Sequence, residues 1–466
     1  MGDRMNVAPN VLALMGHTPL VSLSRVGKGL PFTIYAKLEY LNPGGSVKDR
    51  IGPSMVDAAE RSGLLKPGGT IIEATSGNTG VGLALCAAVK GYKAVFVVPD
   101  KMSAEKIRLL RAYGARVVLT PSQVPAEHPM SHYSVASRLS KEIPNSYYPN
   151  QYENPNNPEA HYRTTGPEIL EALDGNVDAV FATVGTGGTV SGIGRFFKEK
   201  KPSTRIVAVD PQGSILAHYA RTKELVRASP YMVEGIGEDM IPKTVDFSVI
   251  DEFVTVGDKE SFLMARRLAR EEGIFAGGSS GSAVAGVLRW AAASPPKPGA
   301  NIVVIFPDSG DRYLSKFFSD EWMRENRFLD EAATAGALLD AKGFQPALVA
   351  VDPTTTVRSL LQVFHKHDVS QVPVVAGKEN VGSTVEDEVL RAVLADQSLL
   401  DRTVTAVMGA PWPVVGREEP LGEMVKRLKE VRAVLVKAEG TPGFQGLLTR
   451  HDLLSFLSER GDRHAL

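Results

Sequence analysis

The most constraining feature of this 466-residue sequence is a regular alternation of short apolar runs and longer amphipathic segments between about residues 32 and 310. The short runs are rich in β-branched residues, as strands are, and the longer segments repeat their apolar residues at helical spacing. This pattern predicts parallel α/β layers with ligand-binding loops at the carboxyl ends of the strands. Strands are expected at 71–73, 94–98, 117–120, 179–184, 206–210 and 302–306, and helices at 79–90, 104–113, 190–199 and 259–272.

A second unit follows, and it repeats itself. Residues 357–364 match residues 421–428, and residues 382–388 match residues 446–452 with the same offset. Each copy has an apolar helix, a β-rich run, a strand and a second helix. A period of this length indicates a duplicated small domain whose copies pair with each other. We therefore expect one domain at 1–330 and a second at 331–466, and we expect the two repeats of the second domain at about 340–398 and about 400–460.

Composition excludes several classes of function. The 52 Lys and Arg nearly balance the 53 Asp and Glu, so nothing favours nucleic acid or an anionic membrane surface. No run is long enough to span a membrane, and the apolar stretch at 11–15 is too short for the core of a signal peptide, so a cytoplasmic protein is expected. The single cysteine, Cys86, excludes an internal disulfide and a multi-cysteine metal site, and we expect no metal.

One lysine stands in a distinctive local context. The segment Asn42-Pro-Gly-Gly-Ser-Val-Lys-Asp-Arg50 places Lys48 in the first turns of a helix that follows a Gly-Gly turn. The helix dipole disfavours a cation at that end, so we expect a lowered pKa for Lys48, and Schiff-base chemistry requires a neutral amine. On this segment alone, an ordinary solvated lysine explains the pattern better.

Three loops rich in glycine or hydroxyls lie between strands and helices. Residues 73–80, Glu-Ala-Thr-Ser-Gly-Asn-Thr-Gly, carry more donors than a capping turn needs, which favours a bound carboxylate or phosphate. Residues 184–189, Val-Gly-Thr-Gly-Gly-Thr, fit a monophosphate better than a dinucleotide or a Walker loop, with a simple tight turn as the alternative. Residues 277–281, Gly-Gly-Ser-Ser-Gly, match a nucleophile elbow, but the downstream histidines of the sequence lie in the repeated unit, which disfavours a serine hydrolase.

Together with Gly16-His-Thr-Pro-Leu20, these motifs occur in the order typical of fold-type II pyridoxal-phosphate (PLP) enzymes, and the chain resembles this tryptophan-synthase-β-like family over nearly its whole length. The resemblance implies an α/β fold with two parallel subdomains, and Lys48 as the lysine that binds PLP covalently. It assigns Asn78 to the phenolic oxygen of the cofactor and Ser279 to its pyridine nitrogen. A neutral hydroxyl there makes the ring a weaker electron sink, which suits β-replacement. The phosphate would be held by Gly185, Thr186, Gly187, Gly188 and Thr189.

The resemblance also implies a substrate site. Thr75, Ser76, Thr79 and Gln151 would bind the substrate carboxylate, and Tyr152 would line the pocket. Within the family, two stretches are more similar to cystathionine β-synthases than to cysteine synthases. These are Val233-Glu-Gly-Ile-Gly237, with Glu234 where cysteine synthases have an amide or another residue, and residues 307–322. The paired repeats resemble the regulatory Bateman module of the cystathionine β-synthase branch.

The implied reaction condenses L-serine with L-homocysteine to cystathionine and water, and L-cysteine could replace serine with release of hydrogen sulfide. Two alternatives stay open: a cysteine synthase that uses O-acetylserine or O-phosphoserine with sulfide, and a non-catalytic sensor of an adenosyl ligand. The few residues before Gly16 contain no cysteine and do not resemble the haem-binding arm of animal members, so PLP without haem is expected.

The two repeats differ at the positions expected to bind a regulatory ligand. In the second repeat, Thr449 and Asp452 fit the pattern that binds ribose hydroxyls in this module. The matching residues of the first repeat, Val385 and Glu388, lack the hydroxyl. The resemblance therefore implies at most one adenosyl site, with S-adenosylmethionine as the candidate ligand. A module that only dimerises is the alternative, and a homodimer or homotetramer is expected.

Overall fold

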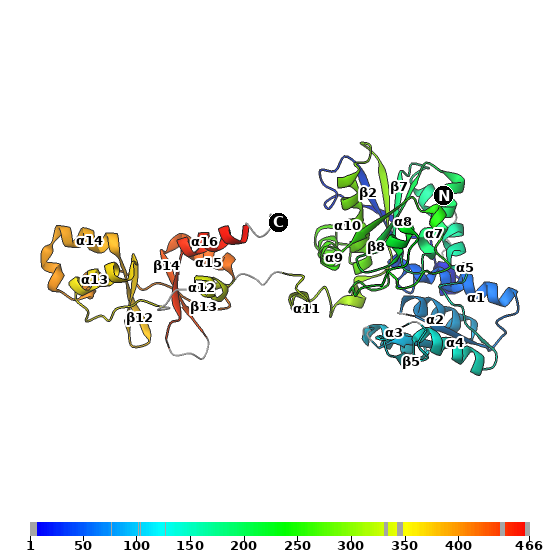
Figure 1. The fold of residues 1–466 in the computed structure, drawn as a ribbon, viewed down its shortest axis with the longest axis horizontal. Helices are drawn as coiled ribbons and strands as arrows, with labels where there is room; N and C mark the ends of the chain where they lie inside the picture. Colours follow the sequence, from blue (N-terminus) through cyan, green and yellow to red (C-terminus); the bar gives the residue numbers. More distant parts are fainter. Residues whose placement is uncertain are drawn as a thin grey trace. The chain divides into compact units, whose positions relative to one another are not determined.

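The protein forms two compact units, Met1–Phe328 and Leu329–Leu466 (Figure 1). The coordinates are a computed structural model. The structure describes residues 7–75, 77–100, 102, 104–125, 127–329, 334–342, 348–438 and 443–461, without the side chains of 457–461.

The first unit contains two sheets. The larger sheet has six strands, parallel except for the edge strand β1, and the smaller has four parallel strands. In spatial order the larger sheet consists of β1 (Leu20–Ser22), β2 (Thr33–Leu38), β10 (Asn301–Phe306), β7 (Ala179–Thr183), β8 (Arg205–Pro211) and β9 (Glu252–Val256). The smaller sheet consists of β5 (Arg116–Thr120), β4 (Lys93–Pro99), β3 (Thr70–Ala74) and β6 (Ser146–Tyr147).

Helices cover both faces of each sheet, which explains why the central strands are apolar without alternation. The helices of this unit are α1 (Ile51–Arg61), α2 (Asn78–Lys90), α3 (Ala104–Ala112), α4 (His132–Glu142), α5 (Asn156–Ala160), α6 (Gly166–Ala172), α7 (Gly188–Lys200), α8 (Leu216–Thr222), α9 (Asp258–Glu272), α10 (Gly278–Ala293) and α11 (Asp320–Glu325). In β7, Phe181 packs into one core with α9 and α10, and its neighbours Val180 and Ala182 pack into another core with α7. Figure 1 shows these helices on opposite sides of the sheet.

The smaller sheet is covered in the same way. Ile71 and Phe96 pack with α1 and α2 on one face, and Ile72 and Val95 pack with α4 on the other. Cys86 is buried in the α1–α2 core, as the apolar sequence around it predicts. All the predicted strands and helices of this unit are present, with ends that differ by a residue or two.

The position of Lys48 differs from the prediction. It lies in a short 3-10 turn, η3 (Val47–Asp49), and α1 begins only at Ile51. The turn is tight because the Ser46 side chain accepts a hydrogen bond from the Lys48 N–H and the Asp49 carboxylate accepts one from Gly44 N–H, at 2.6 Å. Lys48 therefore precedes the helix instead of standing in its first turns.

The second unit contains the predicted duplicated arrangement. The first copy consists of α13 (Val357–His367), β11 (Gln371–Ala376), β12 (Glu379–Val385) and α14 (Glu386–Ala395). The second consists of β13 (Val414–Gly416), α15 (Leu421–Glu430), β14 (Ala433–Lys437), β15 (Gly446–Thr449) and α16 (Arg450–Gly461). Each copy has its own apolar core, α12 (Ala335–Lys342) packs into the core of the second, and a small cluster around Trp412 joins the copies.

None of the helices in the described part of the chain combines the length and the apolar composition needed to cross a bilayer. The same residues contain no group of three or more His, Cys, Asp or Glu side chains placed to share a metal ion.

Candidate active site

A cavity lies at the carboxyl ends of β7 and β10, where parallel α/β sheets bind ligands. Lys48 lines this cavity together with the loop after β7 and with Gly235 and Ile236. Of the predicted phosphate-binding residues, Gly185, Thr186, Gly187 and Thr189 belong to the lining. The fold therefore brings the candidate cofactor lysine and the candidate phosphate loop to one place.

Burial governs the chemistry of Lys48. Burial lowers the pKa of its amine to about 8, against the opposing charges of Asp308 and Glu238. The direction agrees with the expectation from sequence, but the cause is desolvation and not the dipole of a helix that starts beyond the lysine. A pKa near 8 leaves a substantial fraction of neutral amine at physiological pH, which covalent attachment to an aldehyde requires.

The turn that carries Lys48 is anchored by a buried cluster of charges. The Arg50 guanidinium donates to Glu39 at 2.6 and 2.8 Å and to Glu168 at 2.7 Å. Lys37 also donates to Glu168, at 2.6 Å, and to the Thr18 carbonyl. The two cations and two anions balance, and Arg50 and Lys37 overcome burial to lower the pKa of Glu168 to about 2. The cluster explains why the Gly16–Leu20 motif and Arg50 accompany Lys48 in the sequence.

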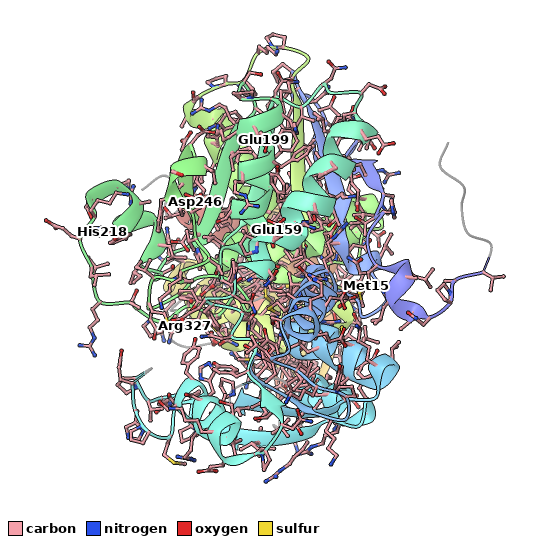
Figure 2. All side chains as sticks on the ribbon, turned by 90° about the vertical axis from the view of Figure 1, so that its right-hand side faces the viewer. Met15, Glu159, Glu199, His218, Asp246 and Arg327 are labelled. Atoms are coloured by element: carbon pink, nitrogen blue, oxygen red, sulfur yellow. The ribbon has the colours of Figure 1, made fainter. Side chains whose placement is uncertain are left out.

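The loop after β7 fits a phosphate group. Its backbone closely approaches its surroundings: a Cβ on Gly188 would lie 1.9 Å from Asn157 Oδ1, and Gly187 has φ of +83°. Such positions admit only glycine, and they leave N–H groups exposed at the start of α7. Glu159, labelled in Figure 2, pairs with Arg195 at 2.5 Å and so ties α5 to α7 behind the loop.

The amide of Asn78 has one orientation. Arg312, which can only donate, donates to Asn78 Oδ1. Asn78 Nδ2 in turn donates to Asp308 Oδ2 at 2.8 Å. One N–H of the amide remains for a ligand, which suits contact with a phenolate oxygen. Asp308 was not among the residues predicted for the site, although its place directly after β10 was a usable signal.

Ser279 is buried in the first turn of α10 and does not line the cavity. Gly277, which precedes this turn, donates its N–H to the Asp308 carbonyl at 2.9 Å. The start of α10 therefore lies beside Asp308, the residue that accepts from Asn78.

The residues predicted for the substrate carboxylate are partly brought together. Thr79 donates to the Gln151 side chain at 2.5 Å, whereas Thr75 caps its own turn by accepting from the N–H groups of Gly77 and Gly80. Ser76 lies outside the described residues. Tyr152 lines a separate hollow, where the centroid of its ring lies 5.3 Å from that of Tyr133 in an edge-on contact.

Glu73, which was not predicted, positions the Gln151 segment. Its fully buried carboxyl group accepts from the N–H groups of Asn150, at 2.8 Å, and Gln151, at 3.3 Å. Burial raises its pKa to about 8, against these two hydrogen bonds. Its place at the end of β3, immediately before the hydroxyl-rich loop, was the available signal.

Glu234 lies between two lysines. Lys106 donates to Oε2 at 2.5 Å and Lys316 donates to Oε1, and these charges lower the pKa of Glu234 although burial opposes them. Its neighbours Gly235 and Ile236 line the cavity, but Glu234 itself does not. It joins α3 of the smaller sheet to the segment after β10.

Comparisons with known proteins identify the family. Residues 11–308 match the model of pyridoxal-phosphate dependent enzymes, and residues 344–395 and 404–459 match the CBS domain. The chain is 41% identical to cystathionine beta-synthase from Oryctolagus cuniculus over 98% of this chain and 86% of the relative. The chain belongs to the cystathionine β-synthase family of PLP-dependent enzymes.

Solved structures place the first unit in the same family. A hydrogen sulfide-producing enzyme from Fusobacterium nucleatum matches with a TM-score of 0.62 and 39% identity, over 66% of this chain and 100% of that one. An O-acetylserine dependent cystathionine beta-synthase from Helicobacter pylori matches with a TM-score of 0.61 and 40% identity, over 67% of this chain and 99% of that one. The predicted fold, a fold-type II PLP enzyme followed by paired CBS repeats, is confirmed.

The paired repeats of this family member hold the predicted ribose-binding residues in contact with each other. Asp452 Oδ2 accepts from the N–H of Thr449 at 2.7 Å and from its hydroxyl at 2.8 Å, at the start of α16. Lys342 of α12 also donates to Asp452, at 3.0 Å, a partner that the sequence pattern did not reveal. In the first repeat, Glu388 pairs instead with Arg432, at 3.2 Å.

The lowered pKa of Lys48 predicts how the apoenzyme takes up its cofactor. Covalent attachment of PLP should accelerate as the pH rises through about 8, because only the neutral amine attacks the aldehyde. Rapid mixing of apoenzyme with PLP, followed by absorbance, measures this rate. Lys48→Ala should lack the covalent absorbance band at every pH. A wild-type rate with no change on either side of pH 8 would contradict the assignment.

Proposed function

We propose that this enzyme joins L-serine to L-homocysteine and releases L-cystathionine and water, and that it accepts L-cysteine in place of serine with release of hydrogen sulfide. The observation that carries the proposal is the placement of Lys48 in one cavity with the glycine loop after β7. The residues present fit PLP: Gly185–Thr189 would hold its phosphate, and Asn78 would contact its phenolic oxygen. Bound PLP would stabilise negative charge at the α-carbon of the substrate.

Each residue then has a defined task. Lys48 Nζ, as a neutral amine, would remove the proton from the α-carbon of the substrate. Thr79 and Gln151, which are already hydrogen-bonded to each other, offer their hydroxyl and amide groups to the substrate carboxylate. Glu73 keeps Gln151 in place through the backbone. Ser279 would offer the pyridine nitrogen a hydroxyl that does not enforce its protonation.

The leaving group distinguishes the proposal from its closest alternative. The rabbit relative is named a cystathionine beta-synthase, whereas the Helicobacter pylori structure is named O-acetylserine dependent. Because hydroxide is a poorer leaving group than acetate, the two donors place different demands on the site.

A product assay tests the proposed reaction. Holoenzyme is incubated with serine, O-acetylserine or cysteine, each with homocysteine or sulfide, and the products are identified by mass. We expect cystathionine from serine and homocysteine, and no product with Lys48→Ala, because the substitution removes both cofactor attachment and the base. Cysteine formed from O-acetylserine and sulfide, without cystathionine from serine, would show a cysteine synthase instead.

We also propose that Glu234 favours homocysteine as the second substrate. Its two ion pairs fix the loop whose next residues, Gly235 and Ile236, line the cavity. Glu234 would therefore act through the loop.

Glu234→Gln should lower the rate of cystathionine formation by about tenfold while PLP affinity changes little, because the amide keeps the shape but loses the charge that holds two lysines. Steady-state kinetics with homocysteine and with sulfide, together with a PLP titration, measure both quantities. The loss should be larger with homocysteine than with sulfide. Equal losses with the two acceptors would reduce Glu234 to a structural residue.

The paired repeats supply the proposed regulatory site. We propose that the second repeat binds one adenosyl ligand, S-adenosylmethionine, through Thr449 and Asp452. The support is a carboxylate that a hydroxyl, an N–H and Lys342 hold at the start of a helix. Such a group can accept from both ribose hydroxyls. Binding alters catalysis only if the ligand prefers one arrangement of the two units.

Calorimetry with S-adenosylmethionine should show about one site per chain, and Asp452→Ala should abolish it because the ribose loses its acceptor. Glu388→Gln, at the matching position of the first repeat, is the control and should bind normally. PLP content and basal activity should persist in both variants. Unchanged binding by Asp452→Ala, or no binding of any adenosyl compound by the wild type, would leave the repeats as a dimerisation module.

A further inference from the structure

We propose that Asp308 is a positioning residue that adapts this site to a hydroxyl leaving group, by keeping Lys48 protonated until its proton can pass to the departing oxygen. The inference rests on the proposed reaction and deepens it, because it names the donor class as an amino acid with a free β-hydroxyl. Asp308 acts through Lys48 and is not itself expected to contact the substrate.

The backbone brings Asp308 beside the Lys48 turn. Ser46 and Asp308 form an antiparallel bridge, and Val47 N–H donates to the Pro307 carbonyl at 2.7 Å. On its other side, a Cβ at Gly277 would lie 2.0 Å from Asp308 Oδ1, so only glycine leaves room for the carboxylate. Asp308 is therefore enclosed between the lysine turn and the start of α10, with 2% of its surface exposed.

The two carboxylate oxygens of Asp308 have different surroundings. Oδ2 accepts from Asn78 Nδ2 at 2.8 Å and from the Tyr313 hydroxyl at 2.6 Å. Oδ1 is buried and has no hydrogen-bond partner among the described residues. A buried carboxylate oxygen without a partner is unfavourable unless a cation compensates its charge. The hydrogen bonds of Oδ2 alone therefore leave part of the negative charge of Asp308 without compensation.

Lys48, on the adjacent turn, is a buried amine on which this negative charge acts. The negative charge of Asp308 is the largest influence that raises the pKa of Lys48, ahead of Glu238, against the stronger effect of burial. A third ionisable group, His161, is in electrostatic contact with Lys48 and is fully buried. Burial lowers the pKa of His161 to about 3, so its ring stays neutral. Without Asp308, burial would favour early loss of the proton from Lys48.

The proton balance shows why this matters for serine. Lys48 Nζ takes the α-proton and becomes an ammonium ion. The Cβ–O bond then breaks with both electrons going to oxygen. A hydroxyl must receive a proton to leave as water, and Lys48 Nζ supplies the one it has just taken, so that it returns to the neutral amine. Acetate or chloride leaves as a stable anion and needs no proton, so those donors do not depend on the ammonium form.

The test compares leaving groups in Asp308→Asn. The amide oxygen still accepts from Asn78 and Tyr313, but the negative charge is gone. With homocysteine as the common acceptor, turnover of serine should fall about a hundredfold or more, the range of general-acid effects, while turnover of O-acetylserine and β-chloroalanine should fall by no more than about threefold. Asp308→Glu, which keeps the charge, should recover part of the serine activity.

A second measurement needs no cofactor. The apoenzyme is labelled with an amine-reactive reagent over a range of pH, and modification of Lys48 is followed by mass spectrometry. The pKa obtained should be lower in Asp308→Asn than in the wild type, and lowered less in Glu238→Gln, because Glu238 is the weaker of the two charges acting on Lys48. If Asp308→Asn does not fold, Glu238→Gln carries the test and must impair serine more than O-acetylserine.

The outcomes separate this inference from the proposed function. Equal losses with serine and the activated donors, or an unchanged Lys48 pKa in Asp308→Asn, would overturn the role of Asp308 while cystathionine synthesis stands. A wild type that uses O-acetylserine but not serine would overturn the proposed donor itself.

Discussion

The catalytic unit depends on a buried balance of charge between Lys37, Glu39, Arg50 and Glu168. The cluster has no net charge, and its ion pairs measure 2.6–2.7 Å. Removing one partner of a buried pair typically costs about 3–5 kcal/mol, because the other charge is left without compensation. Arg50 is two residues beyond Lys48, so the same cluster that joins β2, α6 and the start of α1 also fixes the position of the proposed cofactor lysine. Stability and catalysis therefore depend on the same contacts.

A second chain of contacts links the smaller sheet to the larger one across the site. Asn78 in α2 and Lys106 in α3 both contact the segment after β10. Asp308 accepts a hydrogen bond from Asn78, and the centroid of the Tyr313 ring lies 4.8 Å from Lys106 Nζ. Glu234 extends the chain to the loop that lines the cavity. The contacts that orient the Asn78 amide and those that place the loop are thus continuous. A change in the position of α3 would therefore alter both the orientation of the Asn78 amide and the position of the loop.

The sequence was sufficient for the elements but not for their partners. β3, β7 and β10 were predictable because buried parallel strands are uninterrupted apolar runs, and Lys48 and the glycine loops were identified by motifs that resemble a known family. The places of Glu73 and Asp308 at strand ends marked them as candidates, but the contacts of Glu73, Asp308 and Lys106 were not predictable. Their partners lie 77, 230 and 128 residues away, and a single charged residue contains no information about what it will meet. The same limit applies to Lys342, whose contact with Asp452 spans 110 residues.

The environment of Lys48 combines opposing requirements in one side chain. In its proposed roles as nucleophile and base the amine must be neutral, and burial provides for this by disfavouring the ammonium form. As an acid it must hold a proton long enough to deliver it, and a nearby carboxylate provides for that. Burial alone would leave a good base that is a poor proton carrier, and an exposed lysine would remain protonated and unreactive. A pKa of about 8, set by burial against Asp308 and Glu238, lies near the pH at which both forms are populated. Proton transfer in both directions is then possible without a second titrating group at the reacting carbon.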